Sequence, residues 1–217
     1  MYKTVVFDLD GTLLNTLTDL ADAGNRLCRK YGWPTHERQA YRYFVGNGIP
    51  KLVERLAPAD QRTPAVLEAA LADFKRDYGQ HLRDTTAPYP GIPEMLAKLK
   101  ANGVQLAVFS NKADALAKEV VKDYFGTQYF TIVRGQMTGV APKPAAEGTN
   151  VLLQALHADP ASTLYVGDSN VDVETAHNAN LPCCGAVWGF RTREELNAAG
   201  AEYLAENSDE LYDVIMK

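Results

Sequence analysis

Several features that point to particular classes of protein are missing from this sequence. It has no run of lysines or arginines and its formal net charge is −5, so it lacks the basic footprint of a nucleic-acid binder. No apolar run approaches the roughly 20 residues that a membrane-spanning helix needs. The first residues, "MYKTVVFDLDG", fit neither a signal peptide nor a transit peptide. We therefore expect a cytoplasmic protein with no nucleic-acid partner and no membrane partner.

Cysteine is scarce as well. The three cysteines, Cys28, Cys183 and Cys184, form no CxxC pair and no zinc-binding spacing, and two of them are adjacent. We expect them to be small buried or half-buried residues in a reducing compartment. There is also no P-loop, GxSxG or HExxH motif, which argues against nucleoside-triphosphate, serine-hydrolase and zinc-protease chemistry.

The organisation of the chain changes near residue 88. The 217 residues, 46% of them hydrophobic, suffice for one medium domain or for one domain that carries an insertion. Residues 15–87 predict helices only, with Thr63 as an N-cap and Pro64 at the first position of the longest helix. After the break "DTTAPYPGIP", strand-like apolar runs alternate with amphipathic stretches, which is typical of a parallel sheet with helices on both faces.

The predicted elements follow from these periodicities. Strands are expected at 3–9, 104–111, 129–135, 163–168, 183–187 and near 202–205. Helices are expected from about residue 17, at 37–45, 51–57 and 64–82, and later at 92–101, 113–124, 148–158, 171–179, 192–199 and 208–216. We therefore predict an α/β fold: a Rossmann-like, doubly wound, mainly parallel sheet. It would be built from residues 1–14 and 88–217, with a small all-helical domain, residues 15–87, inserted after the first strand.

Polar side chains follow several of the predicted strands, at the sheet edge where ligands bind in this kind of fold. The residues that this topology would gather there are Asp8, Asp10, Ser110, Asn111, Lys143 and Asp168. Three carboxylates at one edge need a cation, and all-oxygen ligands favour a hard one such as Mg²⁺. Lysine and serine beside them indicate that the other ligand is an anion, with phosphate the natural candidate.

This set of residues suits phosphoryl transfer. A carboxylate that is held against a metal-bound phosphate can attack phosphorus and form an acyl phosphate. The second aspartate of "DLD" can protonate the leaving alkoxide and then deprotonate the water that clears the intermediate. Two aspartates with separate tasks explain this spacing better than two metal ligands alone.

The segments "DLDGT", "SNK", "KP" and "GDSNVD", in this order and at these spacings, resemble the four motifs of the haloacid dehalogenase superfamily. The helical insertion resembles the mobile cap of that superfamily. The segments "FVGNGIPKLVERL", "YPGIPEML" and "WGFR" resemble its phosphoglycolate phosphatase-like branch, so the resemblance covers essentially the whole chain. The chain departs from the family pattern at Asn15-Thr16, where Asp-Ser is frequent, and at Pro144-Ala145-Ala146, where Pro-x-Pro is frequent.

The resemblance implies a role for each motif position on the catalytic side. Asp8 would be the nucleophile and a Mg²⁺ ligand, and Asp10 would be the general acid/base, giving the metal its backbone carbonyl. Asp168 would be the third protein ligand of the metal. Asp172 would orient Lys143 or a metal-bound water.

The resemblance also implies how the phosphate is held. Ser110 and Lys143 would bind the phosphoryl oxygens, and Asn111 would help through its backbone. Thr12 would support the phosphate pocket or the turn after the first strand. In the cap, Asn47 is a candidate for contacting the substrate, as are Lys51 and Arg55.

The first hypothesis is therefore a Mg²⁺-dependent phosphomonoester hydrolase of phosphoglycolate phosphatase type, which acts through an aspartyl-phosphate on a small phosphorylated metabolite. It would be a monomer or a homodimer, and its cap would close over the substrate. Two alternatives stay open: a phosphosugar mutase of the β-phosphoglucomutase type, and a non-catalytic module that binds a phosphometabolite. A dehalogenase is less favoured, because Asp10 would have no leaving alkoxide to protonate.

Overall fold

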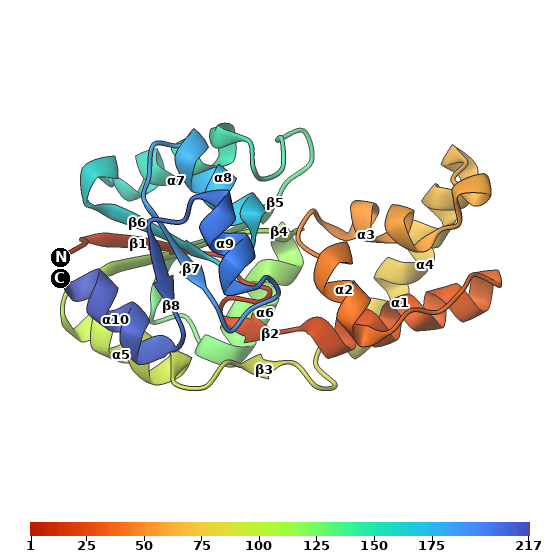
Figure 1. Cartoon of the computed structure of the whole chain (residues 1–217), viewed down its shortest axis with the longest axis horizontal. Helices are drawn as coiled ribbons and strands as arrows, with labels where there is room; N and C mark the ends of the chain where they lie inside the picture. Colours follow the sequence, from red (N-terminus) through yellow and green to blue (C-terminus); the bar gives the residue numbers. More distant parts are fainter. The chain divides into compact units, whose positions relative to one another are not determined.

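The structure, a computed structural model, describes residues 1–217 and divides into two compact units (Figure 1). The α/β unit comprises Met1–Leu14 and Pro88–Lys217, and the helical unit comprises Asn15–Ala87. The helical unit is therefore an insertion in the chain of the α/β unit.

Six strands form the sheet of the α/β unit, and every adjacent pair is parallel. In spatial order they are β5 (Phe130–Gln136), β4 (Gln105–Ala113), β1 (Thr4–Phe7), β6 (Thr163–Gly167), β7 (Cys183–Ala186) and β8 (Tyr203–Ala205). All four residues of β1 are buried, as expected for a central strand that is covered on both faces.

Six helices accompany these strands: α5 (Ile92–Ala101), α6 (Asp114–Phe125), α7 (Ala146–Leu156), α8 (Asn170–Asn178), α9 (Arg193–Ala199) and α10 (Ser208–Met216), with a short 3₁₀ turn, η2 (Pro160–Ser162). Apolar side chains of α7, α8 and α9, such as Leu152, Val173 and Leu196, share one core cluster with Val6 of β1. Helices α5 and α10 lie on the opposite face of the sheet (Figure 1). The predicted doubly wound, mainly parallel α/β fold is thus confirmed, with element ends shifted by about one or two residues.

The strand order has a switch point at β1. From β1 the chain proceeds to β4 and β5 on one side, and it then crosses back to β6, β7 and β8 on the other. Ligands of open α/β sheets bind outside the carboxyl ends of the strands at such a point. The residues that follow β1, β4 and β6 are therefore in the position where this fold builds a site.

The helical unit contains α1 (Leu17–Tyr31), α2 (Arg38–Phe44), α3 (Ile49–Leu56) and α4 (Pro64–His81), with a 3₁₀ turn, η1 (Ala59–Gln61). Helix α1 packs against α4 and α2. The start of α4 is as predicted, because Thr63 accepts a hydrogen bond from the backbone N–H of Val66 and Pro64 occupies the first helical position.

A buried carboxylate ties together the first and last segments of the helical unit. Asp19, in α1, is 2% exposed and accepts hydrogen bonds from the backbone N–H groups of Thr85 and Thr86, each at 2.9 Å. The hydroxyl groups of both threonines donate to the same carboxylate. A charge at this depth is stable only with such donors. The sequence did not predict this contact, since an acid in the first turn of a helix is ordinarily explained by the helix dipole.

Two short strands lie where the chain passes between the units. β2 (Leu14–Asn15) and β3 (Ala87–Pro88) pair in a separate two-stranded sheet. Two-residue strands produce no periodic pattern, which explains why the sequence did not predict them.

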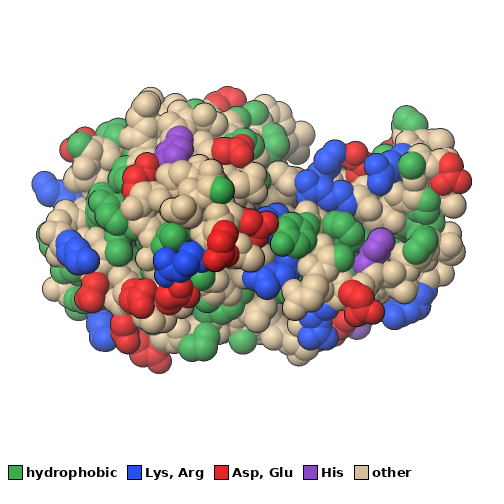
Figure 2. Space-filling view, viewed as in Figure 1, with side chains coloured by type: hydrophobic (Ala, Val, Ile, Leu, Met, Phe, Trp, Pro, Cys, Tyr) green, Lys and Arg blue, Asp and Glu red, His purple; other side chains and the backbone are tan.

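The outer surface carries no dominant feature on the face shown in Figure 2, where acidic and basic side chains are interspersed and hydrophobic ones occur in small groups. None of the helices has the length and apolar character that crossing a membrane requires. The three cysteines are buried, as expected.

Candidate active site

The turn after β1 places two aspartates at the carboxyl end of the central strand. Asp8 continues the sheet ladder, with its backbone N–H donating to the carbonyl of Val166 at 2.8 Å. The chain then turns at Gly11, whose φ of 92° is unfavourable for other residues. A Cβ at Gly11 would lie 2.3 Å from Oδ2 of Asp168, so glycine is also needed for space. The glycine of "DLDGT" thus lets this turn approach a carboxylate from β6.

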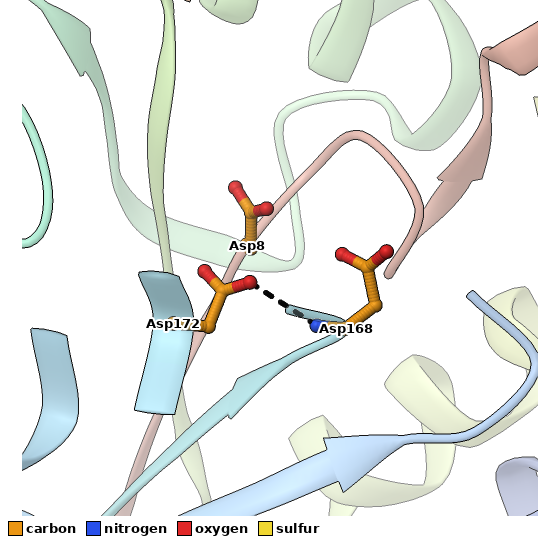
Figure 3. Close-up of side chains that lie close together, drawn as sticks. All are labelled: Asp8, Asp168 and Asp172. Carbon is orange, nitrogen blue, oxygen red and sulfur yellow. Dashed lines mark hydrogen bonds between the residues drawn. The ribbon is translucent and has the colours of Figure 1, made fainter. Parts of the chain in front are cut away.

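Three buried carboxylates meet at this edge of the sheet (Figure 3). Oxygens of Asp8, Asp168 and Asp172 lie within 4.8 Å of one another, and the three residues are 7%, 1% and 1% exposed. Asp8 follows β1, Asp168 follows β6, and Asp172 lies in the first turn of α8. Like charges in so small a buried volume repel one another and lose their hydration, so they need positive partners.

Lys143 supplies one positive charge. Its Nζ lies 2.9 Å from Oδ1 of Asp8 and 2.7 Å from Oδ1 of Asp172. It also donates to the carbonyl of Phe109 and the hydroxyl of Tyr165. Burial on its own would lower the pKa of Lys143, but the two carboxylates outweigh burial and raise that pKa well above its ordinary value. Lys143 is therefore a fixed cation.

Asp8 is the least satisfied member of the cluster. Burial raises the pKa of Asp8 to about 7, an effect that Lys143 opposes and that the charge of Asp172 reinforces. Although its Oδ1 lies 2.9 Å from Nζ of Lys143, this contact is an ion pair without hydrogen-bond alignment. This buried oxygen can therefore still bind a cation or attack an electrophile.

Asp172, in contrast, has both oxygens engaged within the protein. Oδ2 accepts hydrogen bonds from the N–H groups of Asp168 and Ser169, at 3.2 and 3.1 Å, and from the hydroxyl of Ser169 at 2.6 Å. These contacts include a capping box at the start of α8. Oδ1 faces Lys143. This arrangement suits a residue that orients Lys143.

Asp168 is held from two sides. Oδ1 accepts a hydrogen bond from the hydroxyl of Thr12 at 3.2 Å, and Oδ2 accepts one from the N–H of Phe190 at 2.7 Å. A Cβ at Gly189 would lie 2.2 Å from Cβ of Asp168, so the segment "WGF" wraps closely around this residue. Burial, and then the charges of the neighbouring carboxylates, raise the pKa of Asp168 well above its ordinary value. A cation would remove that repulsion.

The end of β4 contributes Ser110 and Asn111, both buried. The side chain of Asn111 brackets Lys143: its Oδ1 accepts from the N–H of Lys143 at 2.8 Å, and its Nδ2 donates to the carbonyl at 3.2 Å. The sequence implied only a backbone role for Asn111. Oγ of Ser110 accepts from the N–H of Lys112 at 3.2 Å, which leaves the hydroxyl proton available to another acceptor.

The structure adds one residue that the sequence did not single out. Lys112 is 5% exposed, and its Nζ lies 3.0 and 3.3 Å from the two carboxylate oxygens of Asp10. The signal was present in the motif "SNK", directly after Asn111. A lysine in a loop or strand end is most often solvated, so this position alone predicts no contact.

Asn47 and the other cap candidates lie in the helical unit, where each has a neighbour. Oδ1 of Asn47 accepts a hydrogen bond from Nη2 of Arg55 at 2.8 Å, and Lys51 forms an ion pair with Glu54 at 2.8 Å. Their contact with a substrate stays a prediction.

The haloacid dehalogenase-like hydrolase family matches residues 5–186. The chain belongs to this family. Among curated relatives, the phosphoglycolate phosphatase of Chromobacterium violaceum is 31% identical over 216 residues, which are 98% of this chain and 96% of that protein. The phosphoglycolate phosphatase of Thiobacillus denitrificans is 31% identical over 191 residues, 87% of this chain and 84% of that protein.

Solved structures agree with the family assignment. A protein from Lactobacillus delbrueckii subsp. bulgaricus, described provisionally as a phosphoglycolate phosphatase, superimposes with a TM-score of 0.93 at 28% identity and covers 99% of this chain and 98% of its own. These similarities confirm that this haloacid dehalogenase-like hydrolase is an enzyme of the phosphatase kind, similar to phosphoglycolate phosphatases.

Proposed function

We propose that this hydrolase is a Mg²⁺-dependent phosphomonoester hydrolase that works through an aspartyl-phosphate on Asp8. Its substrate would be a small organic phosphate in the cytoplasm, with 2-phosphoglycolate the leading candidate because of the activity for which its relatives are named. The observation that carries the proposal is the buried Oδ1 of Asp8, which adjoins the Lys143 ammonium but lacks an aligned hydrogen bond. A carboxylate in this state is available as a nucleophile.

A hard divalent cation fits the residues present. The cluster contains three carboxylates and one ammonium group, which contacts two of them, so it has an excess of negative charge, and the candidate ligand atoms are all oxygens. Asp8, Asp168 and the backbone carbonyl of Asp10 would hold the ion, while Asp172 is already occupied by its hydrogen bonds. When bound, Mg²⁺ would offset the charge of the substrate phosphate and polarise its P–O bonds.

The reaction would proceed in two half-reactions, and both Asp8 and Asp10 would act in each. In the first, a carboxylate oxygen of Asp8 attacks phosphorus, the bond to the leaving-group oxygen breaks, and Asp10 gives its proton to that oxygen. In the second, Asp10 takes a proton from water, the water oxygen attacks phosphorus, and the bond to Asp8 breaks. The products are an alcohol, inorganic phosphate and the restored Asp8 carboxylate.

Two further residues would hold the transferring phosphoryl group. Lys143 is a buried fixed cation, and preorganised charges of this kind stabilise developing negative charge at low cost in reorganisation. The hydroxyl proton of Ser110 would point to a phosphoryl oxygen, since the oxygen of that hydroxyl accepts from the N–H of Lys112.

The test is phosphate release from a panel of phosphomonoesters, with Mg²⁺ and with chelator. The panel contains 2-phosphoglycolate, sugar phosphates, nucleoside monophosphates and pyrophosphate. We expect chelator-sensitive release from one or two compounds, and none from Asp8→Asn. Asp209→Asn, which changes an exposed aspartate of α10, is the matched control and should retain full activity. Turnover by Asp8→Asn above a blank would refute the assignment of the nucleophile.

The two alternatives predict different results in the same experiment. A mutase would isomerise β-glucose 1-phosphate without releasing phosphate. A binding module would bind a phosphometabolite in a metal-dependent manner and hydrolyse nothing on the panel.

A further inference from the structure

Lys112 is a buried cation that the half-reactions described above do not use. It lies near the end of β4, and its side chain is only 2% exposed. Its Nζ contacts both oxygens of Asp10, at 3.0 and 3.3 Å. Lysine is almost never this buried without a partner, and Lys112 contacts the carboxylate of Asp10, 102 positions away in the sequence.

The two aspartates of "DLD" are therefore in contact with different lysines. Lys143 faces Asp8 and Asp172, whereas Lys112 faces Asp10. The side chain of Asp10 is 15% exposed and lies in the turn after β1. A carboxylate in a turn has freedom to rotate, and one ammonium group that contacts both of its oxygens removes much of that freedom.

The placement of Asp10 matters because a proton donor must lie within hydrogen-bond reach of the leaving-group oxygen. Misplacement by about 1 Å is enough to lower a rate by about 100-fold. The backbone at Asp10 is fixed by its bridge to Leu14, but that bridge does not orient the side chain. Lys112 contacts both oxygens of that side chain.

We propose that Lys112 is a positioning residue: its ammonium holds the Asp10 carboxylate where it exchanges protons with the leaving-group oxygen and with water. This inference rests on the proposed function. It gives Lys112 a role that differs from the phosphate-binding role proposed for Lys143, although both are buried lysines at the same edge of the sheet.

The experiment compares two esters whose leaving groups differ in their need for a proton. The alkoxide of 2-phosphoglycolate needs one, whereas 4-nitrophenolate leaves without it. Lys112→Met should lower kcat/KM for 2-phosphoglycolate by about 30-fold or more, and kcat/KM for 4-nitrophenyl phosphate by less than about threefold. Lys112→Arg keeps the charge and should retain the wild-type ratio of the two values within about threefold. Lys118→Met, at an exposed lysine of α6, should change neither value.

A double-mutant cycle tests whether Lys112 acts through Asp10. In an Asp10→Asn background, Lys112→Met should change the remaining kcat/KM for 2-phosphoglycolate by less than about twofold. If Lys112→Met does not fold, as judged by its thermal unfolding, Lys112→Gln takes its place with the same expected ratio.

Two results would overturn the inference while leaving the phosphatase intact. One is an equal loss on both esters, which would mark a phosphate-binding or structural role. The other is full activity of both neutral variants on 2-phosphoglycolate. A folded wild-type protein that hydrolyses neither ester would overturn the proposed function and this inference together.

Discussion

Asp172→Asn removes one carboxylate from the buried contacts of Lys143. It keeps the shape of the side chain and removes the charge. The carboxylate has three donors on Oδ2 and the Lys143 ammonium on Oδ1. An amide has only one oxygen, so its NH₂ group must face either Lys143 or the N–H groups of Asp168 and Ser169. Either orientation sets donor against donor.

The magnitude follows from burial. Removing one partner of a buried ion pair typically costs about 3–5 kcal/mol, because the other charge is left uncompensated. Lys143 would keep Asp8 as a partner, together with the hydroxyl of Tyr165. We therefore expect Asp172→Asn to lower the free energy of unfolding by about 2–4 kcal/mol.

Urea unfolding in the presence of chelator measures this change without a bound metal ion. Glu174→Gln removes a carboxylate from an exposed position of the same helix and should change the free energy of unfolding by less than about 0.5 kcal/mol. The two single variants, Lys143→Met and Asp172→Asn, each lose some free energy of unfolding. The double variant should lose less than the sum of these two losses, by at least about 1.5 kcal/mol. Additive losses, or a loss below about 1 kcal/mol for Asp172→Asn, would show that the pair does not hold Lys143 in place.

Three further outcomes can be measured. Gly11→Ala should lower the free energy of unfolding by about 2–4 kcal/mol and remove most of the phosphatase activity, because it strains a φ of 92° and collides with Asp168. Gly103→Ala, at a φ of 78° with open space around it, should lower that free energy by only about 1–2 kcal/mol and leave the activity unchanged. Equal losses in the two variants would contradict the steric argument. Asp19→Asn should lower the free energy of unfolding by about 2–3 kcal/mol, because hydrogen bonds from Thr85 and Thr86 are lost; an unchanged urea midpoint would show that these hydrogen bonds do not stabilise the helical unit. Mg²⁺ should raise the melting temperature of the wild type but not of Asp168→Asn, and an equal rise in both would place the ion elsewhere.

The sequence predicted the α/β fold well because periodicity and turn chemistry agree along the chain. The apolar run before Asp8 belongs to a buried parallel strand, and Thr63-Pro64 starts a helix through purely local contacts. The paired β2 and β3 could not be predicted, since two residues carry no periodic signal. Asp19 was also missed, because its partners are 66 and 67 positions away.

The candidate site shows the same division between local and long-range information. The motifs identified Asp8, Asp168, Asp172 and Lys143, which the structure brings into one cluster. They did not reveal that Asn111 brackets Lys143 with its side chain, nor that Lys112 contacts Asp10. The contact of Lys112 with Asp10 depends on the register of β4 beside β1, and the contact of Asn111 with Lys143 joins segments 32 positions apart, so both are properties of the folded chain.

The short pairing of β2 with β3 has a consequence for how this protein can change over evolution. The insertion begins at β2 and ends at β3, and these two strands pair with each other. The two points of the α/β unit between which the helical unit is inserted therefore lie side by side in space. The entropy lost in closing a loop grows only with the logarithm of its length, by about 0.6 kcal/mol for each doubling. A longer, shorter or unrelated insert could therefore replace residues 15–87 at small cost to the sheet. The helical unit can therefore be exchanged in evolution while the cluster of three carboxylates stays unchanged.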